Sequence, residues 1–257
     1  MKKPMPKKVQ VIKTQKITEN LQRIVLMSEQ LDAFPDNCDG GYFKLLFNAE
    51  GGTDLSTLEE GQRPIMRTYT IRKFSREDHT IEVDFVRHSV TDLQCGFAAR
   101  WAINAKVGDT ISINGPGLIE DINPQVDWFF MAADMTSLPA LSAKIAKLPE
   151  QAQGYAVIKV IDEADIQALK APANIKFIWL TEKQSLIEQV RALTWLPGDV
   201  SVWAACEFDS MRALRTYFRN EKQVNKENLY LSSYWKHGVT EDGHKVIKRK
   251  DALETQN

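Results

Sequence analysis

The pattern of apolar and polar positions changes about halfway along the chain. From residue 9 to about residue 122, short apolar stretches are separated by turns rich in Gly, Pro, Asn and Asp. Ile81, Val83 and Phe85 alternate with acidic residues, the clearest two-residue period in the chain. Many short strands with one intervening helix predict a small closed or nearly closed antiparallel β-barrel, for which we expect Greek-key topology. The expected strands span 9–17, 21–27, 42–47, 65–73, 80–88 and 110–114, and the helix spans 96–105.

Beyond residue 123, apolar strands alternate with helices. The stretch 128–132 is apolar on both faces, as expected when helices cover both sides of a parallel sheet. We therefore predict a nucleotide-binding type of α/β domain at 124–239, after a barrel domain at 1–123. The polar tail 240–257 is either a short exposed helix or disordered. The expected strands span 127–133, 155–161, 175–180, 200–205 and 229–233, and the helices span 138–148, 186–193 and 210–220.

Composition narrows the class of partner. The 257 residues are 43% hydrophobic and 26% charged, and the formal net charge of −1 gives no reason to expect nucleic acid. The lysine-rich start is not followed by an apolar stretch, and no segment approaches transmembrane length. We expect a cytoplasmic protein without membrane insertion.

Cysteine and histidine usage argues against a resident metal. Cys38, Cys95 and Cys206 lie far apart and form no C-x-x-C pattern, so neither a disulfide framework nor a zinc or iron–sulfur site is expected. The four histidines form no metal-binding helix pair.

The most informative stretch is 66–72, Met-Arg-Thr-Tyr-Thr-Ile-Arg. In a strand, Arg67, Tyr69 and Ile71 share one face and Thr70 points to the other. The Tyr69 ring could lie flat on an isoalloxazine, Arg67 could pair with phosphate oxygens, and Thr70 could reach the flavin N5 edge. Taken alone, the motif also fits a half-buried strand with a solvated arginine at each end.

The chain resembles the siderophore-interacting proteins, a family of FAD-containing ferric-siderophore reductases related to the ferredoxin–NADP reductases. Four blocks carry the resemblance, and their order and separation cover nearly the whole chain. They are 67–72, 84–88 with 96–102, 134–140, and 203–207 with 233–236.

The resemblance implies an FAD site on the barrel. Tyr69 and Thr70 match the positions that contact the reacting flavin, and Arg67 matches the residue that neutralises the diphosphate. The helix starting near Gly96 lacks the family's serine, so we expect the backbone amides of its first turn to bind phosphate. The cofactor-binding residues implied on this domain are Arg67, Tyr69, Thr70, Val86, His88, Ala98, Ala99 and Trp101.

On the α/β domain, the resemblance implies that Asp134, Thr136 and Glu207 contact the nicotinamide or the FAD, at strand ends where open α/β sheets bind ligands. Asp and Thr at such positions would also serve as helix caps in any protein. Lys44 and Lys236 match basic residues that would bind the anionic substrate, although a single surface lysine is more commonly a solubilising charge.

The function implied is that of an FAD-dependent ferric-siderophore reductase. It would pass electrons from NADH, NADPH or possibly ferredoxin through the flavin to an Fe(III)-siderophore, releasing Fe(II) in the cytoplasm. Two alternatives remain open: a flavin reductase that exchanges electrons with a redox-protein partner, and a siderophore carrier without redox turnover.

Overall fold

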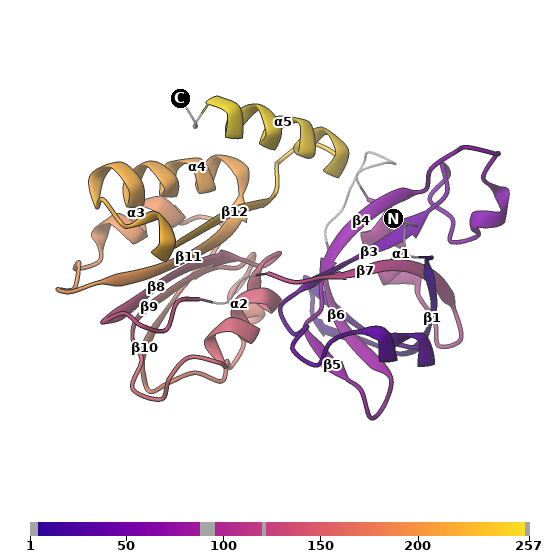
Figure 1. The fold of residues 1–257 in the computed structure, drawn as a ribbon, viewed down its shortest axis with the longest axis horizontal. Coiled ribbons are helices and arrows are strands. Elements are labelled where there is room, and N and C mark those ends of the chain that lie inside the picture. The colour runs from indigo at the N-terminus through magenta and orange to yellow at the C-terminus, as the bar shows by residue number, and fades with distance from the viewer. Residues whose placement is uncertain (1–4, 88–95, 120–121, 255–257) are drawn as a thin grey trace. The chain divides into compact units, whose positions relative to one another are not determined.

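The computed structural model describes residues 5–87, 96–119 and 122–254. The chain divides into two compact units, Met1–Ile119 and Glu120–Asn257 (Figure 1).

The first unit is an antiparallel sheet with strand order β4-β3-β7-β1-β2-β6-β5. Strands remote in sequence are neighbours, since β3 pairs with β7 and β2 pairs with β6, which gives the predicted Greek-key topology. The elements are β1 (Lys7–Thr18), β2 (Leu21–Met27), β3 (Tyr42–Phe47), β4 (Ile65–Thr70), β5 (Lys73–Ser75), β6 (Thr80–Val86), α1 (Phe97–Asn104) and β7 (Thr110–Gly117), with 3-10 turns at Glu29–Ala33 and Leu55–Thr57.

The prediction of a single strand at 65–73 is wrong, because the structure divides this stretch into β4 and β5. Between them, the Ile71 amide donates to the Gly41 carbonyl at 2.8 Å and the Arg72 amide donates to the Glu82 carbonyl at 2.9 Å. Since β4 and β5 are the two edges of the sheet, one continuous run of chain supplies both edges. The run thus bonds to the β3 side through Ile71 and to β6 through Arg72, so the chain itself links the two ends of the strand order, as in a barrel.

The interior of this barrel follows the predicted alternation. Ile81, Val83 and Phe85 of β6 are fully buried and belong to one apolar cluster. Asp84, which alternates with them, is also buried and accepts two hydrogen bonds from Arg23, at 2.6 and 2.9 Å. A buried carboxylate is costly unless it is paired, and this bidentate arginine satisfies it.

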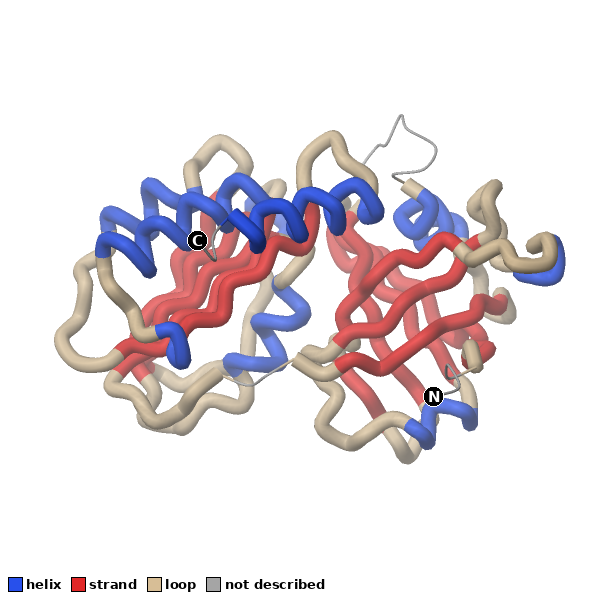
Figure 2. Tube along the Cα trace, turned by 45° about the horizontal axis from the view of Figure 1, so that its top comes forward, coloured by secondary structure: helices blue, strands red, loops and turns tan. Residues whose placement is uncertain are grey.

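The second unit is a five-stranded parallel sheet, as predicted, and helices lie against it (Figure 2). Its strand order is β10-β9-β8-β11-β12. Every residue of β8 is buried, because α2 covers one face of the sheet while α3 and α4 cover the other (Figure 1). The elements are β8 (Trp128–Asp134), α2 (Leu138–Ile145), β9 (Gln153–Lys159), β10 (Asn174–Leu180), α3 (Leu186–Ala192), β11 (Val200–Glu207), α4 (Phe208–Thr216), β12 (Leu229–Trp235) and α5 (Glu241–Glu254), with short 3-10 turns at Glu163–Asp165 and Lys226–Asn228 and a π-helical turn at Tyr217–Glu221.

Strand order creates a topological switch point in this sheet. From β8 the chain proceeds outward through β9 to β10, whereas β11, on the other side of β8, leads outward to β12. The carboxyl ends of β8 and β11 therefore flank a topological switch point, the usual ligand site of open α/β sheets.

The C-terminal tail is helical between Glu241 and Glu254. This helix, α5, buries His244 and Asp251, which lie two turns apart on one face. His244 Nε2 lies 2.8 Å from Ser233 Oγ of β12, and Arg215 of α4 donates to Asp251 at 2.5 Å. Of the two forms expected for the tail, the structure shows a helix, and its polar residues hold it to the second unit.

Candidate functional site

Strand β4 carries the predicted flavin motif. Arg67 is 7% exposed, Thr70 is also buried, and Tyr69 between them is half-buried. The Arg67 guanidinium donates to the Met66 carbonyl at 2.9 Å and lies 5.9 Å from the Phe97 ring centroid. The strand therefore presents a buried cation two residues before a partly accessible phenol ring.

Tyr69 is the first ring of an aromatic series that crosses the barrel. Its ring centroid lies 4.4 Å from that of Phe85 on β6, and Phe85 lies 5.8 Å from Trp101 on α1. Tyr69 and Trp101 pack against the buried cluster yet both keep exposed surface. The Tyr69 ring is thus supported from the barrel side without being sealed.

The start of α1 offers backbone donors. Gly96 is the N-cap and its helix end has no side-chain cap, while Ala98 and Ala99 in the first turn are buried. The first amides of a helix lack intrahelical acceptors and lie at the positive end of its dipole. Together with the buried Arg67, this donor set fits a diphosphate.

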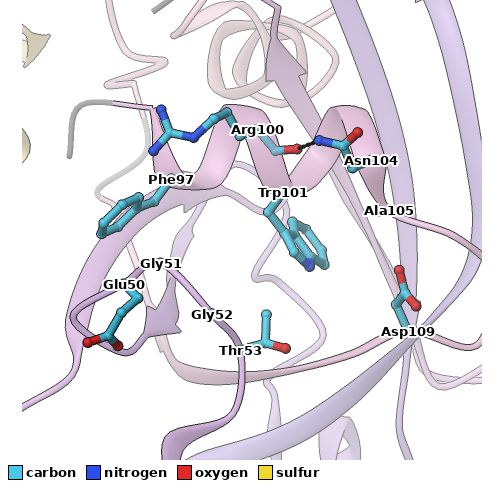
Figure 3. A pocket seen from close by; sticks show the side chains of 10 residues that line it. All are labelled: Glu50, Gly51, Gly52, Thr53, Phe97, Arg100, Trp101, Asn104, Ala105 and Asp109. Atoms are coloured by element: carbon cyan, nitrogen blue, oxygen red, sulfur yellow. Dashed lines mark hydrogen bonds between the residues drawn. The ribbon is translucent and has the colours of Figure 1, made fainter. Parts of the chain in front are cut away.

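A cavity of about 300 Å³ lies beside α1 (Figure 3). The glycine turn at 51–52 forms one wall: Gly51 has φ +83°, and a Cβ there would lie 2.6 Å from the Phe97 ring. The isolated glycine pair was the only sequence signal for this wall, and nothing marked Phe97 as its partner. The cavity is lined by Glu50, Gly51, Gly52, Thr53, Phe97, Arg100, Trp101, Asn104, Ala105 and Asp109.

In the second unit, Asp134 ends β8 at the switch point. Its Oδ1 accepts from the Thr136 amide at 2.9 Å and the Thr136 hydroxyl at 2.6 Å, and its Oδ2 accepts from the Glu207 amide and the Trp235 indole, both at 2.8 Å. Burial raises the pKa of the Asp134 carboxyl, although these hydrogen bonds favour its charged form. All four acceptor positions are filled by the protein, so Asp134 ties the ends of β8, β11 and β12 together.

Glu207 and Lys236 lie at the same end of the sheet. Glu207 is the N-cap of α4, where its carboxylate accepts from the amides of Asp209, at 2.7 Å, and Ser210, at 3.1 Å. Lys236 pairs with Asp209 at 2.8 Å and lies 4.9 Å from the Phe208 ring. The structure therefore brings Asp134, Thr136 and Glu207 together, with the half-exposed Trp235 beside them.

Other expected site residues are placed as follows. Lys44 is half-buried on β3, opposite Thr68 of β4. Val86 ends β6 with a partly exposed side chain. His88 lies outside the described residues.

Two further observations concern metals and membranes. Within 5–87, 96–119 and 122–254, no cluster of three or more His, Cys, Asp or Glu side chains could hold a metal ion. Among the helices of these same residues, none has the length and apolar character to cross a bilayer.

A barrel bearing this strand motif, followed by a parallel sheet, defines the fold class of the ferredoxin–NADP+ reductases. The structure of ferredoxin–NADP+ reductase from Plasmodium falciparum matches with a TM-score of 0.61 at 12% identity, covering 89% of this chain and 96% of that one.

Within this class, residues 10–119 match the siderophore-interacting FAD-binding domain and residues 126–238 match the siderophore-interacting protein model. SipS, a siderophore-interacting protein from Aeromonas hydrophila, is 32% identical, with a TM-score of 0.77 over 90% of this chain and 98% of its own. The ferric vibriobactin reductase ViuB of Vibrio cholerae is 29% identical over 254 residues, 93% of this chain and 92% of ViuB. This chain belongs to the siderophore-interacting protein family.

Proposed function

We propose that the chain is an FAD-dependent ferric-siderophore reductase that takes electrons from NADH or NADPH. The main observation behind this proposal is the buried Arg67 on β4, which lies beside the uncapped start of α1 and two residues before the half-buried Tyr69. The match of this unit to an FAD-binding domain and the reductase name of ViuB support the same function.

The residues of the barrel have separate roles in this proposal. Arg67 and the amides of Ala98 and Ala99 would hold the diphosphate, while Tyr69 would pack against the flavin ring system and Thr70 would donate a hydrogen bond to its reacting edge. Val86, His88 and Trp101 complete the cofactor contacts. When bound, FAD supplies the exchange of electron pairs and single electrons that links a hydride donor to a ferric chelate.

The switch-point residues of the parallel sheet act on the nicotinamide side. Because the Asp134 carboxylate is saturated by protein donors, its proposed role is to hold Trp235 and the Glu207 backbone in place. Thr136 and Glu207 remain the proposed contacts. Ferredoxin is the alternative donor, and reduction by NADH or NADPH in the absence of other proteins distinguishes the two.

The substrate side requires positive charge, since many ferric siderophores are anionic. Lys44 and Lys236 are the proposed binding residues, and the Asp209 partner offsets part of the Lys236 charge. Hard oxygen ligands hold Fe(II) more weakly than Fe(III), so reduction itself releases the metal. We place this release in the cytoplasm.

The decisive experiment is anaerobic stopped-flow mixing of chemically reduced, FAD-loaded protein with ferric siderophores of different chelator classes. We expect the flavin absorbance to return, with a rate that depends on the chelator. Flavin reduction by NADH or NADPH without acceleration by any ferric siderophore would favour a flavin reductase serving a redox-protein partner. Purified protein that neither contains nor binds flavin but binds the chelate would favour the carrier.

A further inference from the structure

Phe97, the first residue of α1, contacts two cations. The guanidinium carbon of Arg67 lies 5.9 Å from the Phe97 ring centroid, and that of Arg100 lies 5.4 Å from it. Both distances are within the range in which a cation is attracted by an aromatic ring. The ring is 6% exposed, so solvent screens these contacts little.

The Phe97 ring is held in a fixed place. It packs against Phe47 of β3 with a centroid distance of 6.1 Å, and the positive-φ turn at Gly51 leaves no room for a Cβ beside it. A ring wedged between a strand, a hairpin and a helix start has little rotational freedom. It therefore gives both guanidinium groups a rigid surface to pack against.

Arg100 belongs to the start of the helix although its Cα is one turn further on. Side chains in a helix lean toward its N-terminus, and Figure 3 shows the Arg100 guanidinium beside Phe97 at that end. The Arg100 guanidinium thus lies beside the helix start, and the Arg67 guanidinium contacts the same ring. Cations beside the first amides of a helix suit a doubly charged anion.

We propose that Arg100 is a second cation for the FAD diphosphate, and that Phe97 is the positioning residue that holds Arg67 and Arg100 for it. This inference rests on the proposed FAD site. It adds to that site a residue outside β4 and an aromatic ring that touches no phosphate itself.

The test compares FAD with riboflavin, which has the same ring system but no phosphate. Arg100→Ala should raise the FAD dissociation constant roughly tenfold or more at low salt, as expected for losing a charge-assisted contact, and should leave riboflavin binding unchanged. High salt should shrink this difference. Arg67→Ala serves as the positive comparison.

Phe97→Leu keeps an apolar side chain but removes the ring, so it should weaken FAD binding about threefold to tenfold, while Phe97→Tyr should restore most of it. Phe74→Leu is the matched control, because it removes an equivalent contact in the same unit, with Arg76 at 5.6 Å. Circular dichroism verifies that each variant folds.

Unchanged FAD affinity in Arg100→Ala would overturn the proposal, as would an equal loss of riboflavin binding, which would place the effect on the ring or the fold. If Phe97→Leu fails to fold, Arg100→Ala alone still decides the cation assignment. If the unmodified protein binds no FAD, the proposed function itself fails, and this inference fails with it.

Discussion

Asp134 shows how a buried carboxylate can organise the strand ends around it through the protein's own donors. Its carboxylate is 9% exposed and accepts four hydrogen bonds from three segments of chain. Leaving any of these donors unsatisfied in the interior is costly. The residue therefore determines where the strand ends and the Trp235 indole lie.

Replacing Asp134 by Asn should lower the free energy of unfolding by about 1–3 kcal/mol, because an amide nitrogen facing the Glu207 amide or the Trp235 indole cannot accept from it. Urea denaturation measures the change. Asp209→Asn, at a more exposed carboxylate of the same unit, is the control and should cost less. In a protein that already carries Trp235→Phe, Asp134→Asn should lower the free energy of unfolding by less than it does in the unmodified protein, because one of its donors is already gone. If the two effects simply add, Asp134 and Trp235 are not coupled.

Lys44 and Lys236 should differ as substrate-binding residues, because only Lys236 has a carboxylate partner among the described residues. In reduction assays at low salt, Lys44→Ala should raise the half-saturating concentration of an anionic ferric siderophore more than Lys236→Ala does, without changing flavin content. Lys13→Ala, at an exposed position of β1, is the control. If neither variant changes the half-saturating siderophore concentration, Lys44 and Lys236 do not bind the substrate.

The sequence nominates single residues but not their partners. Arg67, Tyr69 and Thr70 are nominated as cofactor contacts from one strand motif and the family resemblance, and these roles stay predictions. Arg72 in the same run instead pairs with Asp84 and Glu82, at 3.1 and 3.2 Å, a pairing that depends on the distant strand β6. Such tertiary ion pairs have no signature in local spacing.

At the scale of elements, the helix α5 is the largest addition to what the sequence predicts. Its charged residues resemble a solvated tail, but His244, Lys248 and Asp251 turn toward the second unit. Lys248 donates to the Ser233 carbonyl at 3.0 Å, on the strand that His244 also contacts. The apolar pattern that normally predicts a packed helix is absent from α5, because its contacts with the second unit are hydrogen bonds and ion pairs.

The packing of α5 predicts that the stability of the protein depends on pH. Burial, and next the nearby positive charge of Lys248, lowers the pKa of His244, while Glu241 and Glu207 oppose the shift and Lys236 adds to it. The unfolded chain then binds a proton more readily than the folded one. The stability that His244 contributes is therefore complete above its unfolded pKa of about 6.5 and decreases as pH falls through the folded value.

His244→Gln tests this dependence. The stability advantage of the unmodified protein over the variant, measured by urea denaturation, should be larger at pH 7.5 than at pH 5.5. His237→Gln, at an exposed histidine of the same unit, should show a much smaller change. If this difference in stability is the same at both pH values, protonation of His244 is not coupled to folding.

At the scale of the molecule, the alternation of strands and helices sufficed to predict both architectures, because two-residue and helical periods are set by burial. The predicted strands in each unit are present, with ends shifted by a few residues except at the β4–β5 division. That division could not be read from 65–73, since it arises where one extended run changes neighbours from β3 to β6.

Removing FAD should weaken the barrel more than the parallel sheet. A ligand that binds only the folded state stabilises it by mass action, by about 2.7 kcal/mol at a hundred times its dissociation constant. Hydrogen exchange should therefore slow in peptides covering β4 and α1 when FAD is added to deflavinated protein, and peptides from β10, the edge of the other sheet, serve as the reference. Equal protection in all peptides would contradict a barrel-based site.

The division between β4 and β5 also governs how the molecule meets its neighbours. An open sheet edge is a template on which another chain can add a strand, and it invites domain swapping and aggregation. In the described barrel, Ile71 and Arg72 carry the chain directly from the β3 side to the β6 side, a few positions from Arg67 and Tyr69. An insertion between Ile71 and Arg72 would lengthen this link, and it should make the end strands β4 and β5 more available for pairing with other copies of the protein.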